Sequence, residues 1–293
     1  LYETPELRIE SSDSDRNVYK NAYDLVERIG SLGYYGGDRL IKAAIRKFFT
    51  YCMENNIKLD YRNFSIRYNS SIPRQVGLGG SSAIVTATMR ALMKFFKVSI
   101  PKELLPSLIL AAEVDELGIN AGLQDRVIQV YEGCVYMDFN REIMEQKNHG
   151  IYIPLDKNKL PKLYLAYKTS LSKVSGRALN DIKVRYERGD PEVIAILNRI
   201  AELAEEGKAA IENGDEATLN RLINENFDNR KKIMTISESN QEMIDVAREC
   251  GASAKFAGSG GSIIGIYKDD AMLNRLIVNL KKINARVIKP YIV

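Results

Sequence analysis

Residues 72–85, with the sequence IPRQVGLGGSSAIV, decide how this chain is expected to fold. They follow residues 63–69 (NFSIRYN), in which polar and apolar side chains alternate, and this alternation predicts a strand. They lead into residues 81–96 (SSAIVTATMRALMKFF), where apolar side chains recur at helical spacing. The expected order is therefore strand, glycine-rich loop, helix.

This order is typical of a phosphate site. Glycines allow backbone N–H groups to approach an oxyanion, and a helix N-terminus adds free N–H groups and the positive end of the helix dipole. Ser81 and Ser82 also offer hydroxyls to a phosphate or a metal ion. The loop lacks the lysine of GxxxxGK[ST] and does not match GxGxxG, so a simple glycine-rich helix entry with a serine cap explains it equally well. The candidate phosphate contacts are Pro73, Gly77, Leu78, Gly79, Gly80, Ser81, Ser82 and Ala83.

Composition narrows the class of protein. The chain has 293 residues, 45% of them hydrophobic and 27% charged, which indicates a globular protein of one large domain or two lobes. The net charge of +4 comes from scattered Lys and Arg residues, so we expect no nucleic-acid partner. No apolar run reaches the roughly 18 residues that a membrane span needs, so we expect no membrane partner. The three cysteines lack CxxC spacing, which favours a reducing compartment and the cytoplasm.

The single histidine limits the possible chemistry. His149 alone excludes an HExxH zinc site and argues against a Ser/His/Asp triad, so acid–base catalysis must come from carboxylates, Lys or Tyr. We predict no role for His149 beyond a surface loop.

Acidic residues cluster in the segment 111–126, AAEVDELGINAGLQDR. Glu113 ends an apolar helical run, so its carboxylate is expected where the chain leaves the core. Asp125 follows a glycine turn and precedes Arg126, which favours its ionised form. A kinase needs one carboxylate near magnesium and often a second near the acceptor hydroxyl. A helix N-cap role for Asp125 remains open, and Asp115 and Glu116 are better explained as a solvated helix end.

A second glycine-rich turn, GSGGS at Gly258–Ser262, precedes the predicted strand SIIGIY. Its small residues let the backbone approach a ligand closely. Taken alone, a tight turn between a helix and a strand is the more favoured interpretation.

The remaining patterns predict an α+β protein of two lobes, residues 1–160 and 161–293. Asp38 is expected to cap a helix, Pro101 to open another, and residues 140–162 to form a loop. The expected strands are 1–10, 63–69, 134–139, 163–167, 262–267 and 285–293, and the expected helices include 19–29, 39–52, 81–96, 101–116, 123–133, a helical block over 176–250, and 271–282.

The chain resembles the GHMP small-molecule kinases, and most closely the plant-type glucuronokinases. It shares with them the order of three features: a glycine-rich phosphate loop, then an acidic pair, then a late glycine turn. Long strings over nearly the whole chain carry the resemblance: GYYGG (33–37), IPRQVGLGGSSAIV (72–85), LGINAGLQDRVIQVYEG (117–133), MDF (137–139), HGIYIPLD (149–156) and AKFAGSGGS (254–262). The resemblance implies an N-terminal lobe like the second domain of ribosomal protein S5, with a left-handed crossover, and a ferredoxin-like C-terminal lobe.

The resemblance also implies roles for single residues. The loop 77–83 corresponds to the motif that wraps the phosphates of ATP, with Ser81 and Glu113 at the positions that bind Mg²⁺. Asp125 matches the aspartate near the acceptor hydroxyl, where it acts as a base or an electrostatic anchor. The turn 258–262 matches a motif that lies beside the phosphates and the substrate. The family's first motif would precede Leu1, so we expect a missing upstream segment and an incomplete acceptor pocket.

The expected reaction transfers the γ-phosphoryl group of ATP to the anomeric hydroxyl of a sugar acid, with D-glucuronate favoured. Arg74 or Arg126 is expected to bind the carboxylate, because arginine prefers bidentate carboxylate contacts. Arg74 paired with the nucleotide phosphates, and Tyr34 and Tyr35 as core or rim aromatics, remain alternatives. The alternative functions are a GHMP kinase for galactose, arabinose, fucose or a heptose phosphate, and a non-catalytic sensor of sugar and ATP. The candidate substrate contacts are Tyr34, Tyr35, Gly36, Gly37, Arg74, Arg126, Gly258, Ser259, Gly260 and Gly261. We predict no particular oligomeric state.

Overall fold

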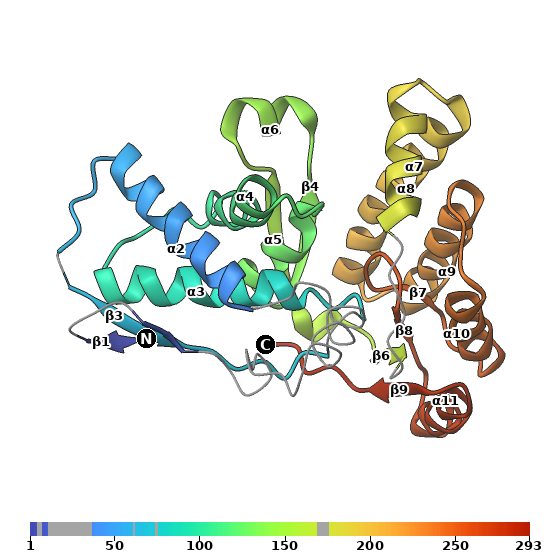
Figure 1. Ribbon diagram of the computed structural model, residues 1–293. Helices are drawn as coiled ribbons and strands as arrows, with labels where there is room; N and C mark the ends of the chain where they lie inside the picture. The colour runs from blue at the N-terminus through green and yellow to red at the C-terminus, as the bar shows by residue number, and fades with distance from the viewer. Residues whose placement is uncertain (5–7, 11–36, 61, 74–75, 169–175) are drawn as a thin grey trace, which may run out of the picture. The chain divides into compact units, whose positions relative to one another are not determined.

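The computed structural model describes residues 1–4, 8–10, 37–60, 62–73, 76–168 and 176–293. The chain forms two compact units (Figure 1). Unit 1 comprises residues 1–71, 79–131 and 137–152, and unit 2 comprises residues 72–78, 132–136 and 153–293. Two short segments, 72–78 and 132–136, thus belong to unit 2 although they precede the boundary expected near residue 160. No helix in the described ranges is long and apolar enough to cross a bilayer.

Unit 1 contains a small sheet of order β1-β3-β2, in which β3 pairs antiparallel with β1 and parallel with β2. The connection from β2 to β3 includes residues outside the described ranges, so the expected left-handed crossover stays a prediction. The strands are β1 (Tyr2–Glu3), β2 (Arg8–Glu10) and β3 (Phe64–Arg67), and the helices are α2 (Gly37–Glu54), α3 (Gly80–Phe96), α4 (Leu105–Leu117), α5 (Leu123–Tyr131) and α6 (Arg141–Lys147).

The core of unit 1 places the start of α3. On α2, Ile41, Ala44 and Phe48 recur at helical spacing and are fully buried, as the sequence predicts. At the other end of α3, the Phe96 ring stacks on Phe48 of α2 with ring centroids 5.9 Å apart, and it meets Phe49 of α2 edge-on at 5.5 Å. Each such aromatic pair adds about 0.5–1.5 kcal/mol beyond area burial. These contacts fix α3 against α2, so the glycine loop at its N-terminus begins from a rigid element.

Unit 2 contains an antiparallel sheet of order β7-β8-β6-β9. In chain order this is second, third, first and fourth strand, with helices after the first and third, which is the ferredoxin-like arrangement. The strands are β6 (Leu163–Lys168), β7 (Lys255–Phe256), β8 (Ser262–Ile266) and β9 (Ala285–Ile288), and the helices are α7 (Gly176–Glu187), α8 (Pro191–Asn213), α9 (Glu216–Ile233), α10 (Glu238–Glu249) and α11 (Asp270–Lys282). The α+β fold with a ferredoxin-like lobe is confirmed.

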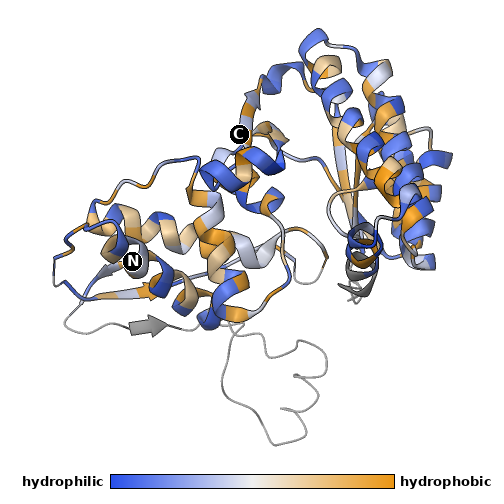
Figure 2. Cartoon of the chain, turned by 90° about the horizontal axis from the view of Figure 1, so that it is seen from above, coloured by the Kyte–Doolittle hydropathy of each residue, from blue (hydrophilic) through white to orange (hydrophobic). Residues whose placement is uncertain are grey.

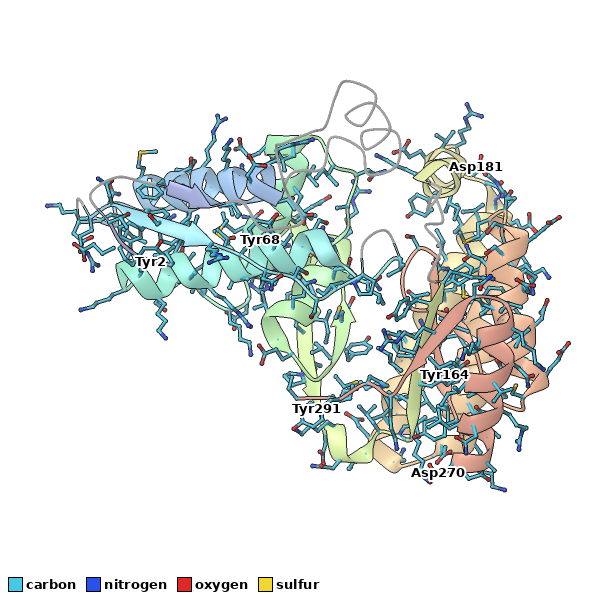
Figure 3. All side chains as sticks on the ribbon, turned by 60° about the horizontal axis from the view of Figure 1, so that its bottom comes forward. Tyr2, Tyr68, Tyr164, Asp181, Asp270 and Tyr291 are labelled. Atoms are coloured by element: carbon cyan, nitrogen blue, oxygen red, sulfur yellow. The ribbon has the colours of Figure 1, made fainter. Side chains whose placement is uncertain are left out.

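Helices α9, α10 and α11 bury one face of this sheet with Phe227, Met243 and Leu276. Hydrophobic and hydrophilic residues alternate along the helices of both units (Figure 2), as expected for helices with one buried face. Tyr164, which is labelled on β6 in Figure 3, is fully buried, and its hydroxyl donates to the Ser253 carbonyl at 2.8 Å. Burial raises the pKa of this phenol well above its ordinary value. The bond secures the chain shortly before β7 and the glycine turn that follows it.

The structure corrects several predicted boundaries. Asp38 lies inside α2, where its carboxylate pairs with Lys42, rather than capping the helix. Helix α4 begins at Leu105, not at Pro101, with Pro106 in its first turn, where a missing N–H costs little. The predicted helix 19–29 lies outside the described residues.

Residues 140–162 contain regular structure instead of the predicted loop. Asn140 caps α6 by accepting a hydrogen bond from the Ile143 N–H, and Asn148 ends the helix in the left-handed conformation. Strand β5 (Ile151–Leu155) then pairs with β4 (Cys134–Asp138) in a two-stranded sheet, and a 3₁₀ turn follows at Lys157–Lys159. The prediction was wrong because Pro154 argued against a strand, but both strands of a two-stranded sheet are edges, where proline is tolerated.

Candidate active site

The glycine-rich loop enters α3 through Gly79, the N-cap residue, whose φ of 63° is left-handed. The Gly79 carbonyl accepts from the Ala83 N–H at 3.0 Å, the Ser82 hydroxyl at 2.9 Å and the Gln129 side-chain amide at 2.9 Å. This carbonyl is therefore turned into the protein. The first N–H groups of an α-helix have no partner within the helix and are available to an anion. The predicted helix start is present, and phosphate binding by it stays a prediction.

Gln129 is a residue of this region that the sequence did not single out. Its amide nitrogen donates to the Gly79 carbonyl and to the Ser82 hydroxyl, both at 2.9 Å, and its oxygen accepts from the Thr86 hydroxyl at 3.1 Å. It lies four residues after Asp125 on α5, which places both side chains on one helix face. That spacing is the signal that would have found it.

Asp125 lies against the same glycine. A Cβ added to Gly79 would stand 3.3 Å from Asp125 Oδ2 and 3.0 Å from Gln129 Nε2, so only glycine fits here without a shift. The Asp125 side chain is 50% exposed, so its carboxylate can meet a ligand. Since α5 begins at Leu123, Asp125 lies inside the first turn and is not the N-cap.

Glu113 is fully buried near the end of α4 and forms an ion pair with Arg126, whose Nε donates to its Oε2 at 2.8 Å. The second carboxylate oxygen, Oε1, is also buried and has no hydrogen-bond partner among the described residues. Such an orphaned carboxylate oxygen is costly unless another ligand satisfies it.

The other half of the glycine-rich loop packs in unit 2 against the turn Gly258–Ser262. Gly77 has a φ of +72°, and a Cβ there would collide with the Gly260 carbonyl. A Cβ at Gly258 would stand 3.1 Å from the Gly77 carbonyl oxygen, and the Ser262 hydroxyl donates to that oxygen at 3.5 Å. The two glycine motifs thus meet backbone to backbone, which explains the need for small residues in both.

Asn240 on α10 holds the late turn by accepting a hydrogen bond from the Gly261 N–H at 3.0 Å. Arg230 on α9 donates to the Gly258 carbonyl at 3.0 Å. Within the described ranges, the Ser259 side chain makes no hydrogen bond to these residues.

Family comparisons agree with this arrangement. Residues 39–133 match the GHMP kinases N terminal domain, and residues 208–285 match the GHMP kinases C terminal domain. The chain belongs to the GHMP kinase family. It is 45% identical to "Glucuronokinase 1" of Arabidopsis thaliana over 82% of this chain and 67% of that protein, and 47% identical to "Probable glucuronokinase 2" over the same shares.

Solved structures show the same fold. The Streptococcus pneumoniae phosphomevalonate kinase superposes with a TM-score of 0.73 at 17% identity, covering 100% of this chain and 88% of that one. The Methanococcus jannaschii mevalonate kinase superposes with a TM-score of 0.67 at 20% identity, covering 98% of this chain and 85% of that one. The GHMP kinase fold expected from the sequence is thus confirmed.

In this kinase, Arg126 does not have the position expected of a substrate ligand. Its side chain is 4% exposed, and its donors reach Glu113 and, at 2.9 Å, the Gly122 carbonyl. Its contact with Asp125 is a longer 3.6 Å. The prediction that it binds a sugar carboxylate is corrected for this reason. Tyr34, Tyr35, Gly36 and Arg74 lie outside the described residues, and Gly37 is the first residue of α2.

The two loop serines of this kinase differ in environment. Ser82 is fully buried, and its hydroxyl donates to the Gly79 carbonyl and accepts from the Gln129 amide. This hydroxyl therefore stabilises the loop and is not free to bind a ligand. Ser81 is half-buried and its hydroxyl makes no hydrogen bond within the described structure. Pro73 before the glycines, Leu78 between Gly77 and Gly79, and Ala83 after them are half-buried.

The site fits a divalent ion that is held mainly by a nucleotide. No group of three His, Cys, Asp or Glu side chains in the described ranges converges as a metal site. Magnesium is usually bound through one or two carboxylates together with substrate phosphates and water, so such a group is not needed. The buried, unpartnered Glu113 Oε1 and the free Ser81 hydroxyl are the groups that suit it.

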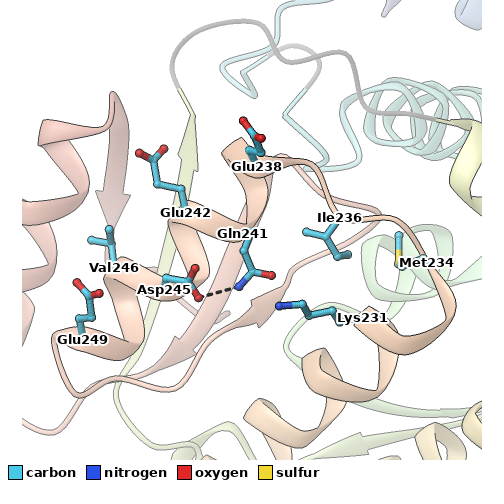
Figure 4. A pocket seen from close by; sticks show the side chains of 9 residues that line it. All are labelled: Lys231, Met234, Ile236, Glu238, Gln241, Glu242, Asp245, Val246 and Glu249. Carbon is cyan, nitrogen blue, oxygen red and sulfur yellow. Dashed lines mark hydrogen bonds between the residues drawn. The ribbon is translucent and has the colours of Figure 1, made fainter.

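One further pocket of this kinase, on α10, does not suit phosphates. Glu238, Glu242, Asp245 and Glu249 project from one side of α10 into it, as Figure 4 shows. Lys231 is the one basic side chain among its lining residues. The surplus of negative charge would repel a nucleotide.

Proposed function

We propose that this kinase transfers the γ-phosphoryl group of ATP to the anomeric hydroxyl of D-glucuronate and forms glucuronate 1-phosphate. The observation that carries the proposal is the 45–47% identity with glucuronokinases over 82% of the chain, together with the adjacent Gly79 and Asp125. The three unpaired cysteines support a reducing compartment, and we place the enzyme in the cytoplasm.

In this proposal the N–H groups at the start of α3 bind the phosphates of ATP, and Gln129 keeps the Gly79 carbonyl turned away from them. Phosphoryl transfer depends mainly on positioning and on neutralising charge. Glu113 and Ser81 would hold magnesium together with the phosphates, and the bound ion would supply part of that neutralisation. Asp125 orients the acceptor hydroxyl and takes its proton as the new bond from oxygen to phosphorus forms and the bond to ADP breaks.

The proposal is tested by measuring ADP release from MgATP with a panel of acceptors: glucuronate, galacturonate, glucose, galactose, arabinose, fucose and a heptose phosphate. The proposal predicts the highest kcat/KM with glucuronate. A higher kcat/KM with a neutral sugar or a heptose phosphate would assign the chain to another GHMP sugar kinase. Binding of sugar and ATP without ADP release would indicate a sensor.

A further inference from the structure

Two basic side chains lie beside the late glycine turn, and neither has so far been given a role toward a reactant. Arg230, near the end of α9, donates from Nη1 to the Gly258 carbonyl at 3.0 Å, with its guanidinium 5.5 Å from the centre of the Phe256 ring. Lys255 on β7 donates from Nζ to the Phe256 carbonyl at 3.3 Å. Both cations therefore bond to the backbone that leads into the turn.

Neither cation has an acidic partner in the described part of the chain. Other arginines of unit 2 do: Arg185 pairs with Asp190, Arg199 with Glu225 and Arg248 with Asp228. Burial lowers the pKa of Arg230, and burial together with the charge of Arg230 lowers the pKa of Lys255 to about 8. Two like charges in a desolvated place are unfavourable unless an anion joins them.

The side chains of Arg230 and Lys255 are both half-buried. Part of each side chain is therefore exposed, and a small anion can reach it. Within the described ranges, Arg230 uses one of its N–H donors for a protein acceptor, and the others are available to a ligand. The glycines at 258, 260 and 261 leave Ser259 and the buried Ser262, whose hydroxyl donates to the Gly77 carbonyl, as the side chains of the turn. Charge, donors and access thus meet on one side of the turn.

We propose that Arg230 and Lys255 form an anion subsite beside the Gly258–Ser262 turn, which binds an oxyanion of one of the two reactants. The oxyanion is the carboxylate of the sugar acid or the terminal phosphate of the nucleotide. The inference rests on the proposed function, and it supplies the cation that Arg126 does not provide for an acidic acceptor.

The test compares Lys255→Met and Arg230→Gln with Lys231→Met, a change at an exposed lysine on α9 that makes no ion pair with the residues that the structure describes. Methionine keeps the length of the lysine chain and removes a desolvated charge, so Lys255→Met is expected to fold. Losing a charge-assisted hydrogen bond weakens binding roughly 10- to 100-fold. Lys255→Arg, which keeps the charge, is expected to recover most of the affinity, whereas a merely structural role would not be rescued.

The readouts separate the two sources of the anion. If the carboxylate binds here, Lys255→Met raises KM for glucuronate with KM for MgATP unchanged. If the terminal phosphate binds here, KM and the calorimetric Kd for MgATP rise instead. The calorimetric Kd for MgATP is measured without an acceptor. The KM for MgATP is measured with whichever sugar the wild type phosphorylates. A wild type that is inactive on glucuronate would therefore contradict the proposed function but not the subsite. Unchanged KM and Kd values in both variants would overturn the subsite.

Discussion

The side-chain amide of Gln129 donates to the carbonyl of Gly79 at 2.9 Å, and it thereby joins α5 to the start of α3. The same amide donates to the Ser82 hydroxyl. Asp125 lies one turn earlier on α5, with its Oδ2 3.3 Å from where a Cβ on Gly79 would stand, so one helix positions both the start of α3 and the proposed base. The distance between these two groups, which we propose meet the reactants, is thus fixed within unit 1.

Gln129→Leu should impair catalysis more than binding of the acceptor. The substitution leaves the Gly79 carbonyl and the Ser82 hydroxyl short of a donor, so the loop loses its orientation. We expect kcat to fall roughly tenfold or more, since a lost positioning bond costs about 1–3 kcal/mol. Steady-state kinetics with MgATP and the acceptor measure this effect. Gln124→Leu, an exposed residue on the same helix, serves as the control and should behave as wild type.

Ser81→Ala and Ser82→Ala should have different effects although the residues are neighbours. Ser81→Ala should raise the magnesium concentration that gives half-maximal activity, because a free hydroxyl is removed. Ser82→Ala should lower the free energy of unfolding by about 1 kcal/mol, because a buried hydrogen-bonded hydroxyl is lost. Magnesium titrations and urea denaturation of both variants check the two results. An identical magnesium dependence in Ser81→Ala and wild type would speak against a metal role for Ser81.

Arg126→Met should destabilise the protein strongly. It leaves the Glu113 carboxylate buried without its cation, and breaking one side of a buried ion pair costs about 3–5 kcal/mol. The double variant Glu113→Gln/Arg126→Met should recover part of the loss, because no charge is then left unpaired. Urea denaturation of the single and double variants measures both values. A double variant less stable than Arg126→Met would contradict the pairing.

Lys255→Met should change how stability depends on pH. Lys255 has a pKa of about 8 in the folded chain, against an ordinary 10.5, so between these values the unfolded chain holds a proton that the folded chain has lost. The residue therefore makes wild type more stable as pH rises through this window. Between pH 7.5 and 10.5, the free energy of unfolding of Lys255→Met should fall by roughly 1–2 kcal/mol relative to that of wild type. This value is smaller than the full pKa shift implies, because the side chain is partly exposed to solvent. Denaturation of both proteins at each pH measures the difference, and a constant difference would rule out the lowered pKa.

The glycine loop and the helix after it were predictable because their signals are local. Glycine, serine and helical spacing all lie within residues 77–96. The ferredoxin-like lobe followed only from resemblance to a family. Gln129 was missed because its role depends on α5 lying beside α3, which no local pattern states.

Arg126 shows why the rest could not be predicted. Its neighbour in sequence, Asp125, suggested a partnership, but adjacent helix residues point about 100° apart and do not face each other. The real partner is Glu113, 13 residues away on α4. Pairings of this kind are set by how helices pack, so the sequence indicated the charged residues but not their contacts.

The most direct test of the central claim is glucuronate 1-phosphate formation, followed by ³¹P NMR, in wild type and in Asp125→Asn. Asparagine keeps the size of the side chain and removes the carboxylate that we propose orients the acceptor hydroxyl. Asp115→Asn, which removes a surface ion pair with Lys47, controls for loss of an acidic side chain elsewhere. We expect wild type and Asp115→Asn to form the 1-phosphate, and Asp125→Asn to lose nearly all turnover with only a modest change in affinity for MgATP. Unchanged turnover in Asp125→Asn, or no glucuronate 1-phosphate from the wild type, would contradict the account.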